Sequence, residues 1–449
     1  MNKRIEVFAL GLLAMCAACC IPSLSSALDI KKEQLPNGLT VLYVEKHELP
    51  IVMATLLIKA SPLQENADKA GTAYITAKLL SEGTATRKAT DISREIDFIG
   101  ASLDTAVNHD FTAVSLSVLK KDVDKGFDLF SDIVLHPSFP ADELARKKEL
   151  LKGFLKQKEE EPSFVASKEF AKDIFGDSPY GRLVEGNLQS IGSIESADVL
   201  NFYGSFYRPE NAILTVVGDI SREELDKLLN RSFASWKTTG EASGSKVDLK
   251  LPPALKGSRV EVINRDVAQA SILFGYVGIA RDNPDYYAVQ VMNYIFGGGG
   301  FSSRLMKVIR DEMGLTYSIN SFFAATKYPG RFEIDVQTKN ESAGRVIEEM
   351  LKQIRLMKAE SISDQEFRDA KDYLIGSFPR RLETSRKTAD FIAAVQYYRL
   401  GDDYIGRYKD YVEKVTKEDI LRVARKYLDD ENYVLVIVGN KKKLVLSSK

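Results

Sequence analysis

The side chains best suited to chemistry at neutral pH are few in this chain. It has three histidines, His47, His109 and His136, and no two of them stand four residues apart, as two metal ligands on one helical face would. We therefore expect a structural role for each. The chain has no G-x-S-x-G motif for a hydrolase-type serine, and the carboxylates within 156–161 are contiguous, as on a solvated helix face. The histidines, serines and carboxylates thus give no independent catalytic constellation.

Three other features have plain structural interpretations. Asp104 and Asp110 flank a predicted hairpin turn, where aspartate is common because its side chain bonds the local backbone. Gly297 to Gly300 form a run of four glycines without the Gly-Lys-Ser/Thr ending of a phosphate-binding loop. Nucleotide binding is therefore not expected.

Composition indicates an ordinary globular protein of more than one domain. The 449 residues are 44% hydrophobic and 28% charged, and 62 basic residues face 63 acidic ones. This near-neutral balance gives no reason to expect nucleic acid or an anionic membrane as a partner. A chain of this length usually forms two or more domains.

Residues 1–27 have the pattern of a cleavable secretory signal. A basic start at Lys3 and Arg4 precedes an apolar run over 7–21, and residues 25–27 offer a small-x-small cleavage site. The apolar run is too short for a comfortable transmembrane helix, so we expect no stable membrane insertion.

The cysteines support export and leave one alternative open. All three, Cys16, Cys19 and Cys20, lie inside the predicted signal, so the mature chain would have neither disulfide nor thiol nucleophile. We expect a periplasmic protein. A lipid anchor on Cys19 and direct secretion are the alternatives.

The chain contains an internal duplication. Residues 198–219 resemble 419–440 at a constant offset of 221, which pairs Asn211 with Asn432. Between the repeats, 237–257 is polar and rich in Gly, Ser and Pro, as linkers are. We therefore predict domains at 28–236 and 258–449.

Each repeat mixes strand and helix periods. Residues 111–119 alternate between apolar and polar side chains, as do 332–336 in the second repeat. Helical patterns occupy 91–99, 123–135, 141–160 and 221–233. The expected class is α+β: two homologous domains, each an antiparallel sheet with helices packed on one face.

The segment GTAYITAKLLSEGT at 71–84 resembles a known zinc motif. It fits without a gap the pattern G-x-A-H-F-L-E-H-x-x-F-x-G-T of the M16 (pitrilysin/insulinase-type) metallopeptidases. Tyr74 and Lys78 stand where that family has its two ligand histidines, and Ala77 stands where it has the general-base glutamate. Tyr, Ala and Lys cannot hold Zn²⁺ or activate water as His, Glu and His do. The resemblance thus implies a degenerate zinc motif with no catalytic residue and no metal in this chain.

The resemblance extends over essentially the whole mature chain. Segments 35–50, 136–151 and 178–191 also resemble M16 segments, and the family's third ligand, a glutamate, falls at Gly153 or Phe154 here. This resemblance implies that the fold is an M16/LuxS-metallohydrolase-like duplication.

In the second half, 297–319 resembles the M16 segment whose arginine and tyrosine contact substrate. Those residues match Arg304 and Tyr317. Both types can donate hydrogen bonds to a scissile carbonyl. Without the family motif, Arg304 would be interpreted as a surface cation and Tyr317 as a strand aromatic.

The resemblance favours one functional hypothesis among three. We expect the non-catalytic, substrate-binding subunit of a heteromeric zinc metallopeptidase that cleaves peptides in an enclosed cavity, with zinc in the partner chain. The second hypothesis is a stand-alone peptide-binding or structural protein without peptidase activity. The third is a stand-alone peptidase with a displaced metal site.

Overall fold

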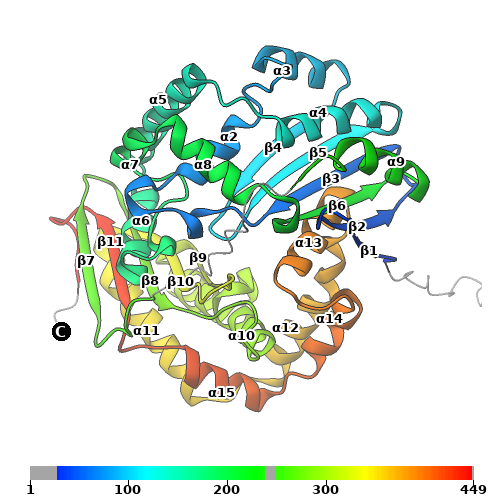
Figure 1. Ribbon diagram of the computed structural model, residues 1–449. Helices are drawn as coiled ribbons and strands as arrows, with labels where there is room; N and C mark the ends of the chain where they lie inside the picture. The colour runs from blue at the N-terminus through cyan, green and yellow to red at the C-terminus, as the bar shows by residue number, and fades with distance from the viewer. Residues whose placement is uncertain (1–27, 238–248, 250, 447–449) are drawn as a thin grey trace, which may run out of the picture.

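The computed structural model describes residues 28–237, 249 and 251–446. They form two halves, each built on one β-sheet with its own helices (Figure 1). The signal predicted at 1–27 lies outside the described residues, as does most of the linker predicted at 237–257. No helix in the described part of the chain is long and apolar enough to span a bilayer.

The first sheet has six strands in the order β1-β2-β6-β3-β5-β4. Its neighbours are antiparallel except for β2 and β6, which are parallel. The strands are β1 (Lys31–Gln34), β2 (Thr40–Glu45), β3 (Ile51–Ile58), β4 (Ser102–Val107), β5 (Thr112–Leu119) and β6 (Ala212–Gly218).

The second sheet repeats this arrangement with five strands in the order β7-β11-β8-β10-β9. Again one pair, β7 and β11, is parallel and the others are antiparallel. The strands are β7 (Arg259–Asn264), β8 (Gln269–Val277), β9 (Thr316–Ala324), β10 (Arg331–Lys339) and β11 (Val434–Gly439). Strand for strand, β7, β11, β8, β10 and β9 correspond to β2, β6, β3, β5 and β4, so the sequence duplication is a duplicated fold.

The described helices divide between the two halves. Those of the first half are α2 (Thr72–Leu79), α3 (Ala89–Phe98), α4 (Val123–Leu135), α5 (Ala141–Lys158), α6 (Pro162–Phe175), α7 (Leu188–Ser193), α8 (Ser196–Phe206) and α9 (Arg222–Ser232). Those of the second half are α10 (Tyr286–Asn293), α11 (Ala343–Ala359), α12 (Asp364–Ser377), α13 (Ser385–Tyr397), α14 (Tyr404–Glu413) and α15 (Lys417–Tyr427). The α+β class predicted from the mixed periods is confirmed.

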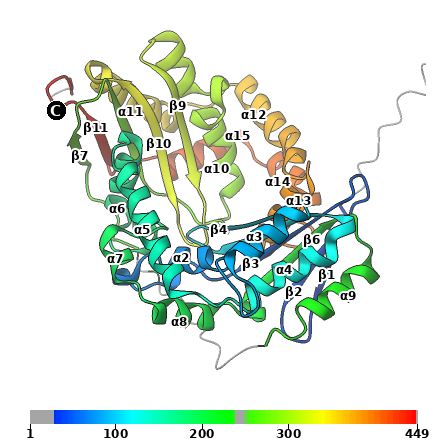
Figure 2. The same ribbon diagram turned by 90° about the horizontal axis from the view of Figure 1, so that it is seen from above.

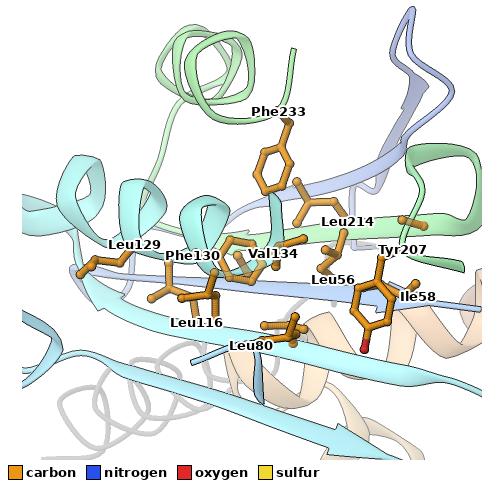
Figure 3. Close-up of a cluster of buried hydrophobic side chains, with 14 of the residues drawn as sticks. Leu56, Ile58, Leu80, Leu116, Leu129, Phe130, Val134, Tyr207, Leu214 and Phe233 are labelled. Carbon is orange, nitrogen blue, oxygen red and sulfur yellow. The ribbon is translucent and has the colours of Figure 1, made fainter. Parts of the chain in front are cut away.

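The first core forms between the first sheet and its own helices. Leu56, Leu116 and Leu214, from three adjacent strands, are fully buried against Phe130 and Val134 of α4 (Figure 3). This packing explains why apolar and polar residues alternate in β5, since its even-numbered apolar residues all lie on the face that α4 covers.

The opposite face of each sheet is covered by a helix from the other half. Helix α13 packs on β3 and β6, and α6 packs on β8 and β11 (Figures 1 and 2). Because of this exchange β6 and β11 are buried along their whole length, which explains why their residues, apart from Thr215 of β6, are apolar and do not alternate with polar ones. The prediction of helices on one face therefore describes each half's own helices, and the exchanged helices α6 and α13 cover the other face.

Candidate functional site

The helix with the degenerate zinc motif, α2, has a constrained start. Its N-cap residue Gly71 has φ 98°, and a Cβ there would lie 2.4 Å from the carbonyl oxygen of Glu185, so only glycine fits. The carboxylate of Glu65 accepts hydrogen bonds from the backbone N–H groups of Gly71 at 3.1 Å and Ala73 at 2.6 Å. Burial raises the pKa of Glu65 to about 7. Sequence reasoning missed Glu65, although an acid just before a helix is a known capping signal.

Lys78 has a defined partner in the first sheet. Its Nζ donates a hydrogen bond of 2.5 Å to the carbonyl oxygen of Thr105, on the edge strand β4. The same ammonium lies 5.5 Å from the centre of the Tyr74 ring. Burial, together with the nearby charge of Lys147, lowers the pKa of Lys78. The second ligand position of the motif thus holds a tethered cation.

The other motif positions are apolar or aromatic. Ala77 is fully buried. Tyr74 is half-buried, and its pKa is raised by burial and by the charge of Glu185. Phe154 of α5 lines the same pocket, of about 240 Å³, as Tyr74 and Lys78. Of the two candidates for the third ligand position, Phe154 is therefore the one that lines this pocket.

These residues do not fit a zinc ion. A tetrahedral site needs three or four nitrogen, sulfur or carboxylate ligands, whereas this pocket offers one phenol, the aromatic ring of Phe154 and the ammonium groups of Lys78 and Lys147. Two cations in one small pocket repel a third. Within the described ranges, no three His, Cys, Asp or Glu side chains are grouped so that they could hold a metal ion.

Arg304 lies in the second half and is paired there. Its Nε and an Nη donate to the two carboxylate oxygens of Glu366 at 2.6 and 3.1 Å, and 18% of its side chain is exposed. Burial alone would raise the pKa of Glu366, but the hydrogen bonds from Arg304 and Ser363 lower it to about 2. Two π-helical segments, η6 (Tyr294–Gly298) and η8 (Met306–Glu312), stand on either side of Arg304 in the chain. Such segments are frequent at functional sites.

Tyr317 is a projecting aromatic residue. It lies near the start of β9, the edge strand of the second sheet, and is 86% exposed. The Nε of Arg310 donates to its backbone oxygen at 3.1 Å, and the Arg310 guanidinium stacks 4.7 Å from the ring of Phe301, which is 70% exposed. Tyr317 is thus an exposed aromatic side chain whose backbone is bonded to Arg310, whereas Arg304 is held by an ion pair. The positions 74, 77 and 78 lie in the other half.

The histidines each have a local partner. His47 lies 2.6 Å from Asp219 and 2.8 Å from Glu45. His109 contacts the backbone oxygen of Arg182 at 2.9 Å, and burial lowers its pKa. His136 lies 3.4 Å from Asp132. These contacts agree with the structural role expected for the three.

Asp110 has a role that its turn position did not indicate. Only 2% exposed, it accepts hydrogen bonds of 2.7 Å from the hydroxyls of Tyr180 and Tyr398 and one of 2.9 Å from the backbone N–H of Lys327. Tyr397 donates to its backbone oxygen at 2.8 Å. Tyr180 belongs to the first half and the other three to the second. The aspartate is thus a buried junction between the halves, whereas Asp104 is exposed.

Fold and site together define a class: a duplicated α+β protein with two exchanged helices and a metallopeptidase motif whose metal ligands are replaced. Two family models match the chain in sequence, "Insulinase (Peptidase family M16)" over residues 40–187 and "Peptidase M16 inactive domain" over 193–374. The protein belongs to the M16 peptidase family.

Relatives and solved structures agree with this assignment. Proteins named uncharacterized zinc proteases are 26% identical over 416 residues in Rickettsia bellii (91% of this chain, 97% of that protein) and 28% identical over 433 in Mycobacterium leprae (90% of each). A crystal structure titled peptidase M16 inactive domain, from Pseudomonas fluorescens, is similar with a TM-score of 0.86 and 28% identity, covering 94% of this chain and 100% of that one. A protease from Helicobacter pylori shares the fold, with a TM-score of 0.85, 21% identity and coverage of 92% and 100%.

Proposed function

We propose that this protein is the non-catalytic, substrate-binding subunit of a heteromeric zinc metallopeptidase. The observation that carries the proposal is the ammonium of Lys78, bonded to Thr105 in the position of a metal ligand. The helix that would hold the metal is retained. It begins after its N-cap residue Gly71 and is capped by Glu65, whereas the side chains that would bind zinc are replaced. A retained scaffold without ligands favours a role in binding over one in bond cleavage.

The zinc would then come from a partner chain of the same family. The resemblance implies this division, because in M16 members built from two different chains one supplies the zinc helix and the other can supply the arginine and tyrosine. Tyr317 supports the proposal, since an exposed phenol on an edge strand is free to meet a peptide. It would donate a hydrogen bond to a peptide carbonyl near the scissile bond and so stabilise developing negative charge.

Arg304 needs one further step in this scheme. Its guanidinium is engaged by Glu366, so it reaches substrate only if a remaining N–H points to the cavity or if the ion pair opens. While it is paired with Glu366, Arg304 would hold its own segment of the chain against α12, close to the substrate.

The ion pair also favours the second candidate, a peptide-binding or structural protein without a peptidase partner. If Arg304 serves only to fix α12 against the glycine-rich segment, the second half needs no zinc chain to explain it. The exposed side chains of Phe301 and Tyr317 would then contact a peptide or another protein directly.

We also propose that the chain is exported to the periplasm by its N-terminal signal. The absence of cysteine after position 20 supports this, since such a chain needs no disulfide chemistry outside the cytoplasm. Cell fractionation with a C-terminal tag tests it. A chain found in the cytoplasm with residues 1–27 attached contradicts export.

Affinity purification of the tagged full-length protein from its native host tests the subunit role. Metal content and cleavage of a mixed peptide substrate are measured on the eluate. A zinc-containing second chain of similar size that co-purifies with cleavage activity supports the proposal. A chain that elutes alone, metal-free and inert supports the second candidate.

A further inference from the structure

A pocket at the junction of the two halves is lined by cations without acids. Its volume is about 350 Å³, within the lower part of the range of about 300–1,000 Å³ usual for ligand pockets. Five of the ten lining residues belong to the first half of the chain and five to the second. The lining residues are Thr40, Lys59, Leu63, Gln64, Ile213, Lys327, Tyr328, Gln396, Tyr397 and Arg399.

Three of these residues are cationic, and among the described residues that line the pocket none is an acid. Lys59 follows β3, Lys327 lies in the turn between β9 and β10, and Arg399 follows α13. The Lys59 backbone is fixed, since its N–H donates to the oxygen of Asn211 at 3.0 Å. Burial lowers the pKa of Lys59, and the charges of Arg399 and Lys327 lower it further. The three cations are thus close enough to repel one another.

One buried carboxylate close to lining residues, that of Asp110, is already engaged. Asp110 accepts hydrogen bonds from Tyr180, Tyr398 and the backbone N–H of the lining residue Lys327. Its lone pairs are directed to these donors and not to the cationic side chains. The positive charge in the pocket is therefore available to a ligand.

The backbone at Arg399 is a second, independent sign of a site. Its φ is 56°, in the left-handed region where a helix end usually has glycine, and only one other non-glycine residue in the described ranges, Phe139, has a positive φ. A side chain kept at such a position costs free energy, and strained residues cluster at ligand sites. Here the left-handed turn after α13 brings a guanidinium to the pocket.

We propose that this pocket binds a small oxyanion of the phosphate type, which bridges the two halves. Two ammonium groups and one guanidinium are three cationic donors that can surround a doubly charged anion, and Gln64, Gln396 and Thr40 can complete its hydrogen bonds. The ligand would join Lys59 of the first half to Lys327 and Arg399 of the second. It would therefore relieve repulsion across the junction and stabilise the arrangement of the halves. The site is separate from the degenerate zinc motif, so the inference does not depend on the subunit role.

Calorimetric titration of the purified full-length chain tests the proposal. The probes are inorganic phosphate, glycerol 3-phosphate and chloride, each at constant ionic strength. We expect saturable one-to-one binding of phosphate but not of chloride. If glycerol 3-phosphate binds more tightly than phosphate, the natural ligand is a phosphate monoester, and if it binds equally or less tightly the ligand is the free ion.

Variants assign the binding to this pocket. Lys59→Met and Arg399→Gln should each weaken phosphate binding by about 10-fold or more, since each removes a charged donor. Lys414→Gln, at an exposed lysine away from the pocket, is the control and should leave binding unchanged. Lys59→Met should also raise the melting temperature measured without phosphate, because it removes repulsion, and this readout excludes a merely misfolded variant. Absence of saturable phosphate binding, equal binding of chloride, or unchanged affinity in both pocket variants would overturn the proposal.

Discussion

The hydroxyl of Tyr398 donates a hydrogen bond of 2.7 Å to the carboxylate of Asp110, and 288 positions of the chain separate the two residues. Asp110 lies in the β4–β5 turn, and Lys327, which also donates to it, lies in the structurally corresponding β9–β10 turn. The corresponding hairpins of the duplicated halves therefore meet at one buried carboxylate. Together with the exchanged helices α6 and α13, this junction holds both halves in one arrangement.

Asp110→Asn should destabilise the protein. The amide has only one acceptor oxygen for the three donors that Asp110 satisfies, and its own N–H₂ would face donors. We expect a loss of about 2–4 kcal/mol in the free energy of unfolding, from weakened charge-assisted hydrogen bonds and unpaired buried groups. Urea denaturation of the purified chain measures it. Asp104→Asn, at an exposed position of the same hairpin, should change stability by no more than about 0.5 kcal/mol. Equal effects of the two changes would refute a special role for Asp110.

The zinc motif can be rebuilt if only its side chains have changed. Tyr74→His, Ala77→Glu, Lys78→His and Phe154→Glu together restore two histidines at i and i+4, a general-base carboxylate and an acidic third ligand. We expect about one zinc per chain in the fourfold variant and none bound stoichiometrically in the unchanged chain, measured by atomic emission after dialysis. The matched control lacks only Phe154→Glu and should bind zinc more weakly. If both variants bind zinc with the same affinity, Phe154 does not occupy the third position.

The tyrosine and arginine of the second half should differ in what they contribute. Tyr317→Phe removes one hydroxyl from an 86% exposed side chain, so stability should stay within about 0.5 kcal/mol. In the assembled complex, peptide turnover should fall by about 10-fold or more if the hydroxyl stabilises developing charge. Tyr373→Phe, at a tyrosine of α12 that is 48% exposed, is the control and should leave turnover unchanged. Unchanged turnover in Tyr317→Phe would remove Tyr317 from the shared site.

The ion pair of Arg304 gives a pH-dependent contribution to stability. The pKa of Glu366 is about 2 in the folded chain and near 4.3 in an unfolded one. A carboxylate with a depressed pKa stabilises the fold above its unfolded pKa and loses this contribution as the pH falls toward its folded pKa. Glu366→Gln should thus cost about 1–2 kcal/mol at pH 7 and progressively less between about pH 4.5 and pH 2. Denaturant titrations of both proteins across this interval measure the difference, and a constant difference would contradict the assignment.

Local patterns in the sequence predict much of the fold. The four helices expected in the first half correspond to α3, α4, α5 and α9, with ends that differ by no more than two residues. The alternation of 111–119 correctly identifies the buried face of β5. These successes share one cause, since both depend on neighbours within a few residues.

Contacts between distant segments could not be predicted in this way. Nothing near Asp110 in the sequence distinguishes it from Asp104, because its partners Tyr180, Lys327 and Tyr398 come from far along the chain. The exchange of α6 and α13 left one trace in the sequence: β6, apart from Thr215, and β11 are apolar along their whole length, which indicates strands buried on both faces. Similarly, the motif frame located Lys78 but not its bond to Thr105.

Reconstitution of peptide cleavage tests the central claim most directly. The chain and the zinc-containing M16 chain recovered with it are purified separately, and hydrolysis of a peptide library is measured for each alone and for the equimolar mixture. The account predicts that this chain alone contains no zinc and cleaves nothing, and that the mixture cleaves peptides much faster than the zinc chain alone. Stoichiometric zinc and chelator-sensitive cleavage in this chain alone would contradict it.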